Sequence, residues 1–256
     1  MTLFPKVALV TSSSAGTCDR MAQRFACAGV KVMICGRNAA QGRATVAQIR
    51  ADGGSASFTL ADIAVLSDVQ AAIDETIATY GRLDILFNYV SGLHSSDGEL
   101  TQVSESVWDR VMETALKGTF FCCQYALPFL RQSGNGTVIN TIEQLVAPEA
   151  FRSMASICSS GLAAITQEIA QQYSDRHVSA NLVFATPSDR PPPTLSGRIL
   201  YGPVTSPIDP IEHLATSPSS RPFVSLEEAV MYLAQRGKDL QGTTLMVNTT
   251  LTQRVY

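Results

Sequence analysis

Short apolar runs and longer amphipathic segments alternate along most of the chain. The short runs are rich in Val, Ile and Leu, whereas apolar residues recur every three or four positions in the longer segments. Continuous apolar runs are typical of strands buried on both faces, and the wider spacing is typical of helices. This alternation predicts an α/β fold in one domain, with a doubly wound parallel sheet of about seven strands and helices on both faces. Strands are predicted at residues 6–11, 31–35, 56–60, 83–87, 138–142, 178–184 and 243–247, and helices at 16–29, 40–52, 66–80, 104–132, 156–173 and 226–236.

The segment from Ala185 to Arg221 breaks this rhythm, because it shows no clear periodicity. It contains eight of the twelve prolines of the chain. A loop of this length inside a compact domain is usually functional or mobile. We therefore expect residues 1–256 to form one domain, in which 185–221 is a proline-rich insertion.

Length and composition narrow the class of protein. The chain has 256 residues, of which 45% are hydrophobic and 16% are charged, as in an ordinary globular domain. Its net charge of −3 provides no basic surface for nucleic acid or for anionic lipid. No apolar run approaches the roughly 20 residues of a membrane span, and the first residues lead into a strand rather than a signal peptide. These features predict a cytoplasmic protein that binds neither nucleic acid nor a membrane.

The six cysteines and three histidines show no spacing that is typical of metal ligands. No two cysteines form a C-x-x-C pair, and most of them lie in apolar helix or strand patterns. Reduced, buried thiols are the expected state for such residues in the cytoplasm. We predict no metal site.

Four short segments occur in an order that is typical of one enzyme family. They are GRLDILFN at 81–88, LKGTF at 116–120, GTVIN at 136–140 and GTTLMV at 242–247. In this order and spacing, the chain resembles the short-chain dehydrogenase/reductase family from residue 6 to about residue 251. The resemblance implies a Rossmann-like fold and makes 185–221 the substrate lid. It also implies a homodimer or homotetramer formed through the helices at 104–132 and 156–173.

The resemblance places a dinucleotide site after the first strand, where the chain departs from the family pattern. The family has T-G-x-x-x-G-x-G in this turn, whereas residues 11–18 read TSSSAGTC and keep only Gly16. Ser12 and Cys18 replace the other two glycines, so phosphate binding is expected to be weaker. The positions that the resemblance assigns to a cofactor are Thr11, Ser12, Ser13, Ser14, Gly16, Thr17, Arg37, Asp62, Ile63 and Asn88.

Arg37 distinguishes between the two nicotinamide cofactors. An acidic residue just after the second strand would bind the ribose 2′-hydroxyl of NAD, whereas an arginine suits the 2′-phosphate of NADP. NADP(H) is therefore the candidate cofactor, and NAD(H) or no nucleotide at all are the alternatives. Arg37 can equally be a solvated surface charge. Tyr89 and Val90 add bulk beside the expected nicotinamide ribose.

The catalytic positions of the family hold other residues in this chain. The family uses an Asn, a Ser, a Tyr and a Lys for the proton transfer that accompanies carbonyl reduction. Counted along the chain, these positions hold Ala115, Glu143, Ala155 and Ser159. No Tyr or Lys lies between Glu143 and Thr166, so a shift of one residue does not restore the set. The usual proton-transfer route is therefore expected to be absent.

Glu143 is the strongest candidate for acid–base chemistry. It follows a central strand, and α/β folds build their sites at the carboxyl ends of such strands. The alternative is that Glu143 faces solvent or pairs with Arg152. Ser156 and Ser159, which are one helical turn apart, are expected to line the same cleft, with packing as the alternative. His94 lies on the loop after the fourth strand and is expected to reach the cleft, with an exposed loop position as the alternative.

Three functions are compatible with these observations. The first is an enzyme repurposed for cyclisation, isomerisation, elimination or aldol-type proton transfer on a small organic substrate, with Glu143 as acid or base. The second is an atypical NADP(H)-dependent oxidoreductase, which Arg37 and Asp62 favour. The third is a catalytically inactive partner subunit that docks through its long helices.

Overall fold

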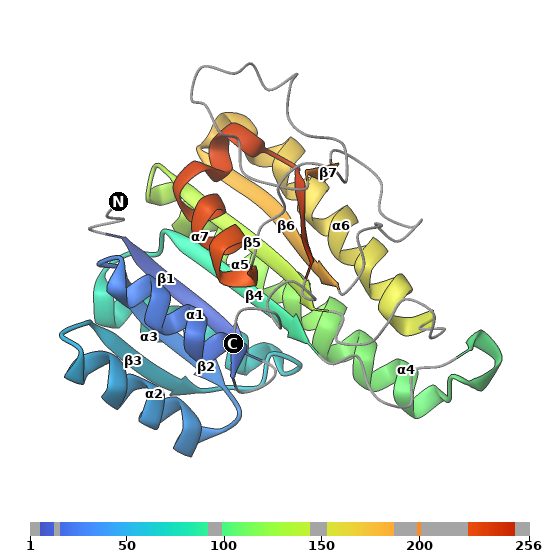
Figure 1. The fold of residues 1–256 in the computed structure, drawn as a ribbon, viewed down its shortest axis with the longest axis horizontal. Coiled ribbons are helices and arrows are strands. Elements are labelled where there is room, and N and C mark those ends of the chain that lie inside the picture. Colours follow the sequence, from blue (N-terminus) through green and yellow to red (C-terminus); the bar gives the residue numbers. More distant parts are fainter. Residues whose placement is uncertain are drawn as a thin grey trace.

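The computed structural model describes residues 6–12, 16–91, 99–143, 153–186, 199–200 and 225–248. Its strands form one sheet in the order β3-β2-β1-β4-β5-β6-β8-β7, in which all neighbouring strands are parallel. Figure 1 shows this sheet at the centre of the molecule. The strands are β1 (Val7–Ser12), β2 (Lys31–Gly36), β3 (Ala56–Leu60), β4 (Ile85–Ser91), β5 (Gly136–Glu143), β6 (Val178–Thr186), β7 (Ile199–Leu200) and β8 (Thr244–Asn248).

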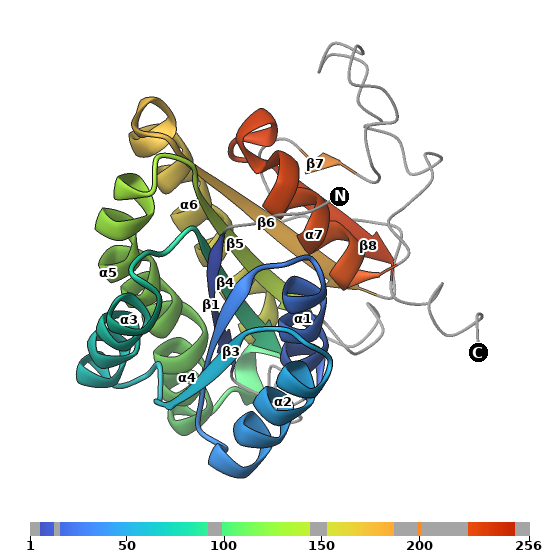
Figure 2. The same cartoon turned by 90° about the vertical axis from the view of Figure 1, so that its left-hand side faces the viewer.

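Helices cover both faces of the sheet. Figure 2 shows α1, α2 and α7 on one face and α3, α5 and α6 on the other. The predicted α/β fold, a single-domain doubly wound parallel sheet, is therefore confirmed. The helices are α1 (Thr17–Cys27), α2 (Ala39–Ala51), α3 (Leu66–Tyr80), α4 (Glu105–Val111), α5 (Thr119–Gln132), α6 (Ser153–Tyr173) and α7 (Leu226–Arg236).

The long helix predicted at 104–132 is helical from Glu105 to Gln132, but it is not α-helical throughout. Between α4 and α5 the backbone is π-helical over Met112–Gly118, with Ala115 buried in the middle of this segment. π-Helical turns are rare and often lie at functional sites. Gly118, the last residue of this segment, lies close to the backbone of Ile63. A Cβ atom at this position would lie 2.8 Å from the backbone oxygen of Ile63, so the contact depends on two backbones approaching closely.

The predicted lid contains one short element within the described residues. Ile199 pairs with Thr244 and Leu200 with Leu245, so β7 extends the sheet beyond β8. The strand β6 also runs further than predicted, to Thr186. Most of the predicted lid lies outside the described residues, and its role as a lid stays a prediction.

The side chains of the central strands alternate between the two faces, as expected for buried strands. On β5, Ile139 packs with residues of α1 and α7, whereas Ile142 packs with residues of α4 and α6. On β4, Tyr89 belongs to the first cluster and Val90 to the second. Because of this alternation, each side chain at the carboxyl edge of the sheet points either toward α1 and α7 or toward α4 and α6.

All six cysteines lie in described segments, and none is bonded to another. Five are buried, and Cys27 is exposed at the end of α1. Burial raises the pKa of the Cys35 and Cys123 thiols to about 12, so both stay protonated at neutral pH. Among the described helices, none is long and apolar enough to cross a membrane.

Candidate functional site

Three side chains from distant parts of the chain meet at the carboxyl edge of the sheet. The Tyr89 hydroxyl donates a hydrogen bond to Oε2 of Glu143. Thr17 Oγ1 donates a second hydrogen bond, of 3.3 Å, to the same oxygen. Tyr89 and Thr17 are buried, and Glu143 is half-buried. We call these three residues the Glu143 cluster.

The strand register brings Tyr89 and Glu143 together. β4 and β5 are parallel, and Tyr89 pairs with Thr141, two residues before Glu143. Residues two apart on a strand share a face, so Tyr89 and Glu143 point to the same side. That side is covered by α1, whose first residue is Thr17. The cluster therefore joins the ends of two central strands to the start of a helix.

A second set of polar contacts ties the cluster to α7. Arg20 Nη2 donates to Thr17 Oγ1 at 3.0 Å, and Arg20 Nε lies 2.7 Å from Oε1 of Glu227. Arg20 is on the first turns of α1, and Glu227 is on the first turn of α7. The guanidinium thus lies between Glu227 and the hydroxyl that binds Glu143.

The environment of Tyr89 keeps its phenol neutral. The pKa of Tyr89 lies well above its ordinary value, mainly because the side chain is buried. The hydrogen bond to Glu143 raises this pKa further. The ring stacks on Phe87 with 6.4 Å between the centroids, and Phe87 meets Phe25 of α1 edge to face. A neutral phenol is a proton donor, so at physiological pH its hydroxyl proton points at the carboxylate.

The residues predicted to bind a cofactor lie in different surroundings. Arg37 and Asp62 form an ion pair of 3.6 Å, and the Arg37 side chain is 57% exposed. Ile63 is buried in the core beside α3 and α5.

Gly16 has φ +96° and caps α1, where its N–H donates to the Asp19 carboxylate at 3.0 Å. Ser13 and Ser14 lie outside the described residues, and Ser12 is the last residue of β1.

Thr11 and Asn88 belong to a buried chain of hydrogen bonds inside the sheet. Thr11 Oγ1 donates to Asn88 Oδ1, Asn88 Nδ2 donates to Asn140 Oδ1, and Asn140 Nδ2 donates to Thr166 Oγ1, each at 2.9 Å. These four residues link β1, β4, β5 and α6. The side chains of Thr11 and Asn88, predicted to bind a cofactor, are thus engaged in holding the strands together.

The two predicted serines lie on α6. α6 packs on the face of the sheet opposite α1, and Ser159 is buried there with its Oγ donating to the Ala155 carbonyl at 2.6 Å. Ser159 thus forms a hydrogen bond within its own helix, and its place in the cleft of Glu143 stays a prediction. Ser156 is half-buried on the same helix, and its carbonyl accepts from Ser160 Oγ at 2.9 Å. His94 and Arg152 lie outside the described residues.

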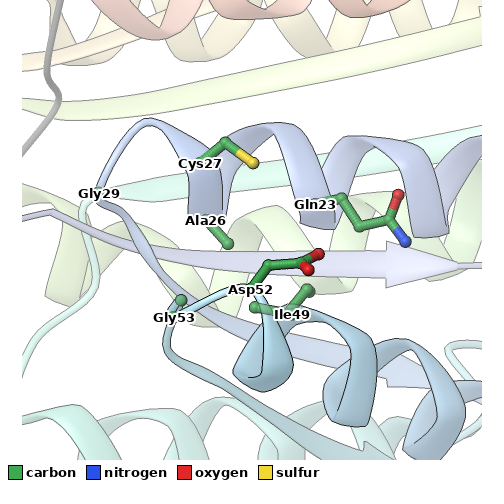
Figure 3. Close-up of a pocket in the computed structure, with 8 residues that line it drawn as sticks. Gln23, Ala26, Cys27, Gly29, Ile49, Asp52 and Gly53 are labelled. Carbon is green, nitrogen blue, oxygen red and sulfur yellow. The ribbon is translucent and has the colours of Figure 1, made fainter.

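A separate hollow of about 210 Å³ lies at the opposite end of α1. Figure 3 shows it between the last turns of α1 and α2, with Gln23 and Ala26 on one side and Ile49 and Asp52 on the other. Helices of a parallel α/β fold end at the amino edge of the sheet. This hollow is therefore remote from the Glu143 cluster, and it includes the exposed Cys27.

The chain is similar to known proteins of one enzyme family. The model of one family, described as short chain dehydrogenase, matches residues 6–189. This chain belongs to the short-chain dehydrogenase family. The D-threitol dehydrogenase of Mycolicibacterium smegmatis is 30% identical over 183 residues, which is 71% of this chain and 69% of that protein.

Solved structures of short-chain dehydrogenases share the fold over almost the whole chain. A dehydrogenase/reductase from Sinorhizobium meliloti 1021 has a TM-score of 0.74 and 26% identity, and the match covers 96% of this chain and 94% of that chain. An actinorhodin polyketide ketoreductase variant with NADPH has a TM-score of 0.72 at 20% identity, covering 96% and 97%. Short-chain dehydrogenases generally bind NAD(P)H, and the relatives of this chain are of the oxidoreductase type.

Sequence reasoning missed three residues around Glu143. The sequence suggests Tyr89 only as bulk beside a ribose, because its contact with Glu143 depends on the register of β4 and β5, which the sequence does not show. Arg20 and Glu227 give no signal in the sequence either, because 207 positions separate them and only the packing of α1 against α7 brings them together.

Proposed function

We propose that this chain is an enzyme of the short-chain dehydrogenase family that transfers a proton on a small organic substrate, with Glu143 as acid or base. Cyclisation, isomerisation, elimination and aldol-type reactions all include such a step. One observation carries the proposal. The half-buried Glu143 carboxylate is oriented by two hydroxyl donors at the carboxyl edge of the sheet, where doubly wound folds bind their ligands.

The residues on α6 support the same proposal. By the resemblance, Ala155 and Ser159 stand where the family has its Tyr and Lys. Ala155 has no titratable group, and the Ser159 hydroxyl donates to the backbone of its own helix. Ala115, at the expected Asn position, is buried in the π-helical segment. We therefore propose that the family's proton-transfer set is replaced, and that Tyr89 and Glu143 supply the titratable pair.

Hydrogen–deuterium exchange at carbon tests this proposal without knowledge of the substrate. The purified chain would be incubated in D₂O, without added nucleotide, with a panel of ketones that carry acidic α-hydrogens, and followed by ¹H NMR. We expect exchange with the unaltered protein and its loss in Glu143→Gln, with the fold retained by circular dichroism. Glu228→Gln, at an exposed position of α7, is the control with the same change in charge. A Glu143→Gln protein that exchanges at the full rate would contradict the assignment.

A second candidate is an NADP(H)-dependent oxidoreductase, and the position of Arg37 favours it. Arg37 follows β2 and is more than half exposed beside Asp62, so its guanidinium is accessible to a phosphate. The similarity to a dehydrogenase supports the same candidate. Steady oxidation of NADPH in the presence of a carbonyl compound, followed at 340 nm, would select this candidate. Arg37→Ala should then weaken NADPH binding more than NADH binding.

We also propose that the chain forms a homodimer or homotetramer through α4, α5 and α6. An open, largely apolar groove lies on these helices, lined by Met112, Leu116, Phe120, Phe121 and Ile165 among others. Phe120 is 46% exposed and Trp108 is 42% exposed. Large exposed apolar patches are typical of protein interfaces. Light scattering should give a multiple of the 27.4 kDa chain mass, and Phe120→Glu should reduce it to the monomer.

A further inference from the structure

The start of α1 is the place where a dinucleotide would bring its negative charge. The first N–H groups of a helix have no partner within the helix, and the helix dipole favours an anion there. In doubly wound folds the pyrophosphate lies at this helix terminus. In this chain, Thr17 is the first residue of α1 and Gly16 is its cap.

Carboxylates already lie at this helix terminus. Asp19 accepts from the Gly16 N–H and is turned toward α2 by Thr45 and Gln41, at 2.7 and 2.8 Å. Glu143 approaches from the sheet and binds the Thr17 side chain at 3.3 Å. The nearby cation, Arg20, is paired with Glu227. Glu143 and Asp19 thus place two carboxylates at the start of α1, where a pyrophosphate would add further negative charge.

The two ends of a dinucleotide site therefore differ in how well they fit a nucleotide. At the adenosine end, the exposed Arg37 suits a phosphate. At the pyrophosphate end, the Glu143 carboxylate lies against Thr17, and Tyr89 fixes it there. The residues present do not fit a pyrophosphate at the start of α1.

We propose that Glu143 determines which ligands this site accepts. Its carboxylate acts as an internal anion at the start of α1, so the site rejects phosphate groups and admits an uncharged organic molecule. The rejection of phosphate depends on the contact between Thr17 and Glu143. The inference that the substrate is uncharged also rests on the proposed function, because this inference assumes that the substrate lies against Glu143.

Titration with NADPH, followed by nicotinamide fluorescence, tests this proposal directly. Glu143→Gln removes the charge and keeps the size of the side chain. We expect it to bind NADPH at least about tenfold more tightly than the unaltered protein does. Glu228→Gln makes the same change in net charge at an exposed position of α7 and should leave the affinity unchanged. Inorganic pyrophosphate should compete with NADPH for Glu143→Gln. Such competition would show that the added affinity comes from the pyrophosphate of NADPH.

Equal affinity of the unaltered protein and Glu143→Gln for NADPH would overturn the proposal. If Glu143→Gln does not fold, Glu143→Ala tests the same charge, because it removes the carboxylate altogether. An affinity for NADPH that is unchanged in Glu143→Ala would then count against the proposal. These outcomes are read from binding alone, so they are distinct from the loss of deuterium exchange that tests the acid–base role of Glu143.

Discussion

The hydroxyl of Tyr89 and the carboxylate of Glu143 are joined by a hydrogen bond at the carboxyl ends of two adjacent strands, β4 and β5. Both side chains point to the face that α1 covers, away from the helix where the family resemblance places its catalytic residues. A phenol and a carboxylate in direct contact can exchange a proton. The chain therefore holds a phenol against the residue that, by the resemblance, stands at the family's serine position.

Replacing Tyr89 with Phe should destabilise the fold. The substitution removes a donor from the half-buried Glu143 carboxylate, and loss of such a partner costs about 1–3 kcal/mol. Urea denaturation of Tyr89→Phe should show this decrease in the free energy of unfolding. Tyr125→Phe is the matched control, since no hydrogen bond of its hydroxyl is found among the described residues, and it should change the free energy little. A Tyr89→Phe protein as stable as the unaltered one would argue against the contact.

Stability should also fall at alkaline pH, and part of this fall should depend on Tyr89. Its pKa in the folded state is raised, mainly by burial, above the value of about 10 in an unfolded chain. The folded state therefore holds the proton more tightly, and stability is fully present below pH about 10 and is lost as the pH rises further. Urea midpoints at pH 9 and pH 11 would measure this loss. The loss should be smaller in Tyr89→Phe, and an equal loss in both proteins would exclude Tyr89 as its source.

Gly118 should be intolerant of a side chain. A Cβ atom there would lie 2.8 Å from the Ile63 oxygen and 3.2 Å from its carbonyl carbon, and neither backbone atom can move easily. Gly118→Ala should lower the free energy of unfolding by about 1–3 kcal/mol. Gly161→Ala is the comparison, because its Cβ would meet the terminal atoms of the flexible Leu116 side chain. Thermal denaturation should rank Gly118→Ala as the more damaging change, and the reverse order would contradict the close approach of the backbones.

Cys27 should be the thiol that reacts first with an alkylating reagent. It is exposed, whereas the other five cysteines are buried, and burial raises the pKa of Cys35 and Cys123 to about 12. Thiolate is the reactive form, so buried and protonated thiols react slowly. Mass spectrometry after brief treatment of the native protein with iodoacetamide should show one modification, which Cys27→Ser removes. Rapid modification of several cysteines would show that the fold opens more readily than its packing indicates.

The sequence by itself determined the order of strands and helices and the parallel sheet. Apolar runs and helical periodicity are local properties, so α3 and α7 were predicted with the boundaries that the structure has. The position of Glu143 at a strand end followed from the same pattern. Local patterns carry this information because each strand and helix must bury its own apolar face.

Only the tertiary structure decided what Glu143 contacts. Tyr89 and Thr17 are 54 and 126 positions away from it, and strand order and register bring them together. The same packing places Ser159 on the other face and lets Gly118 meet the backbone of Ile63. Such contacts join residues that no local pattern relates, because they depend on which strands become neighbours and on how closely two backbones approach.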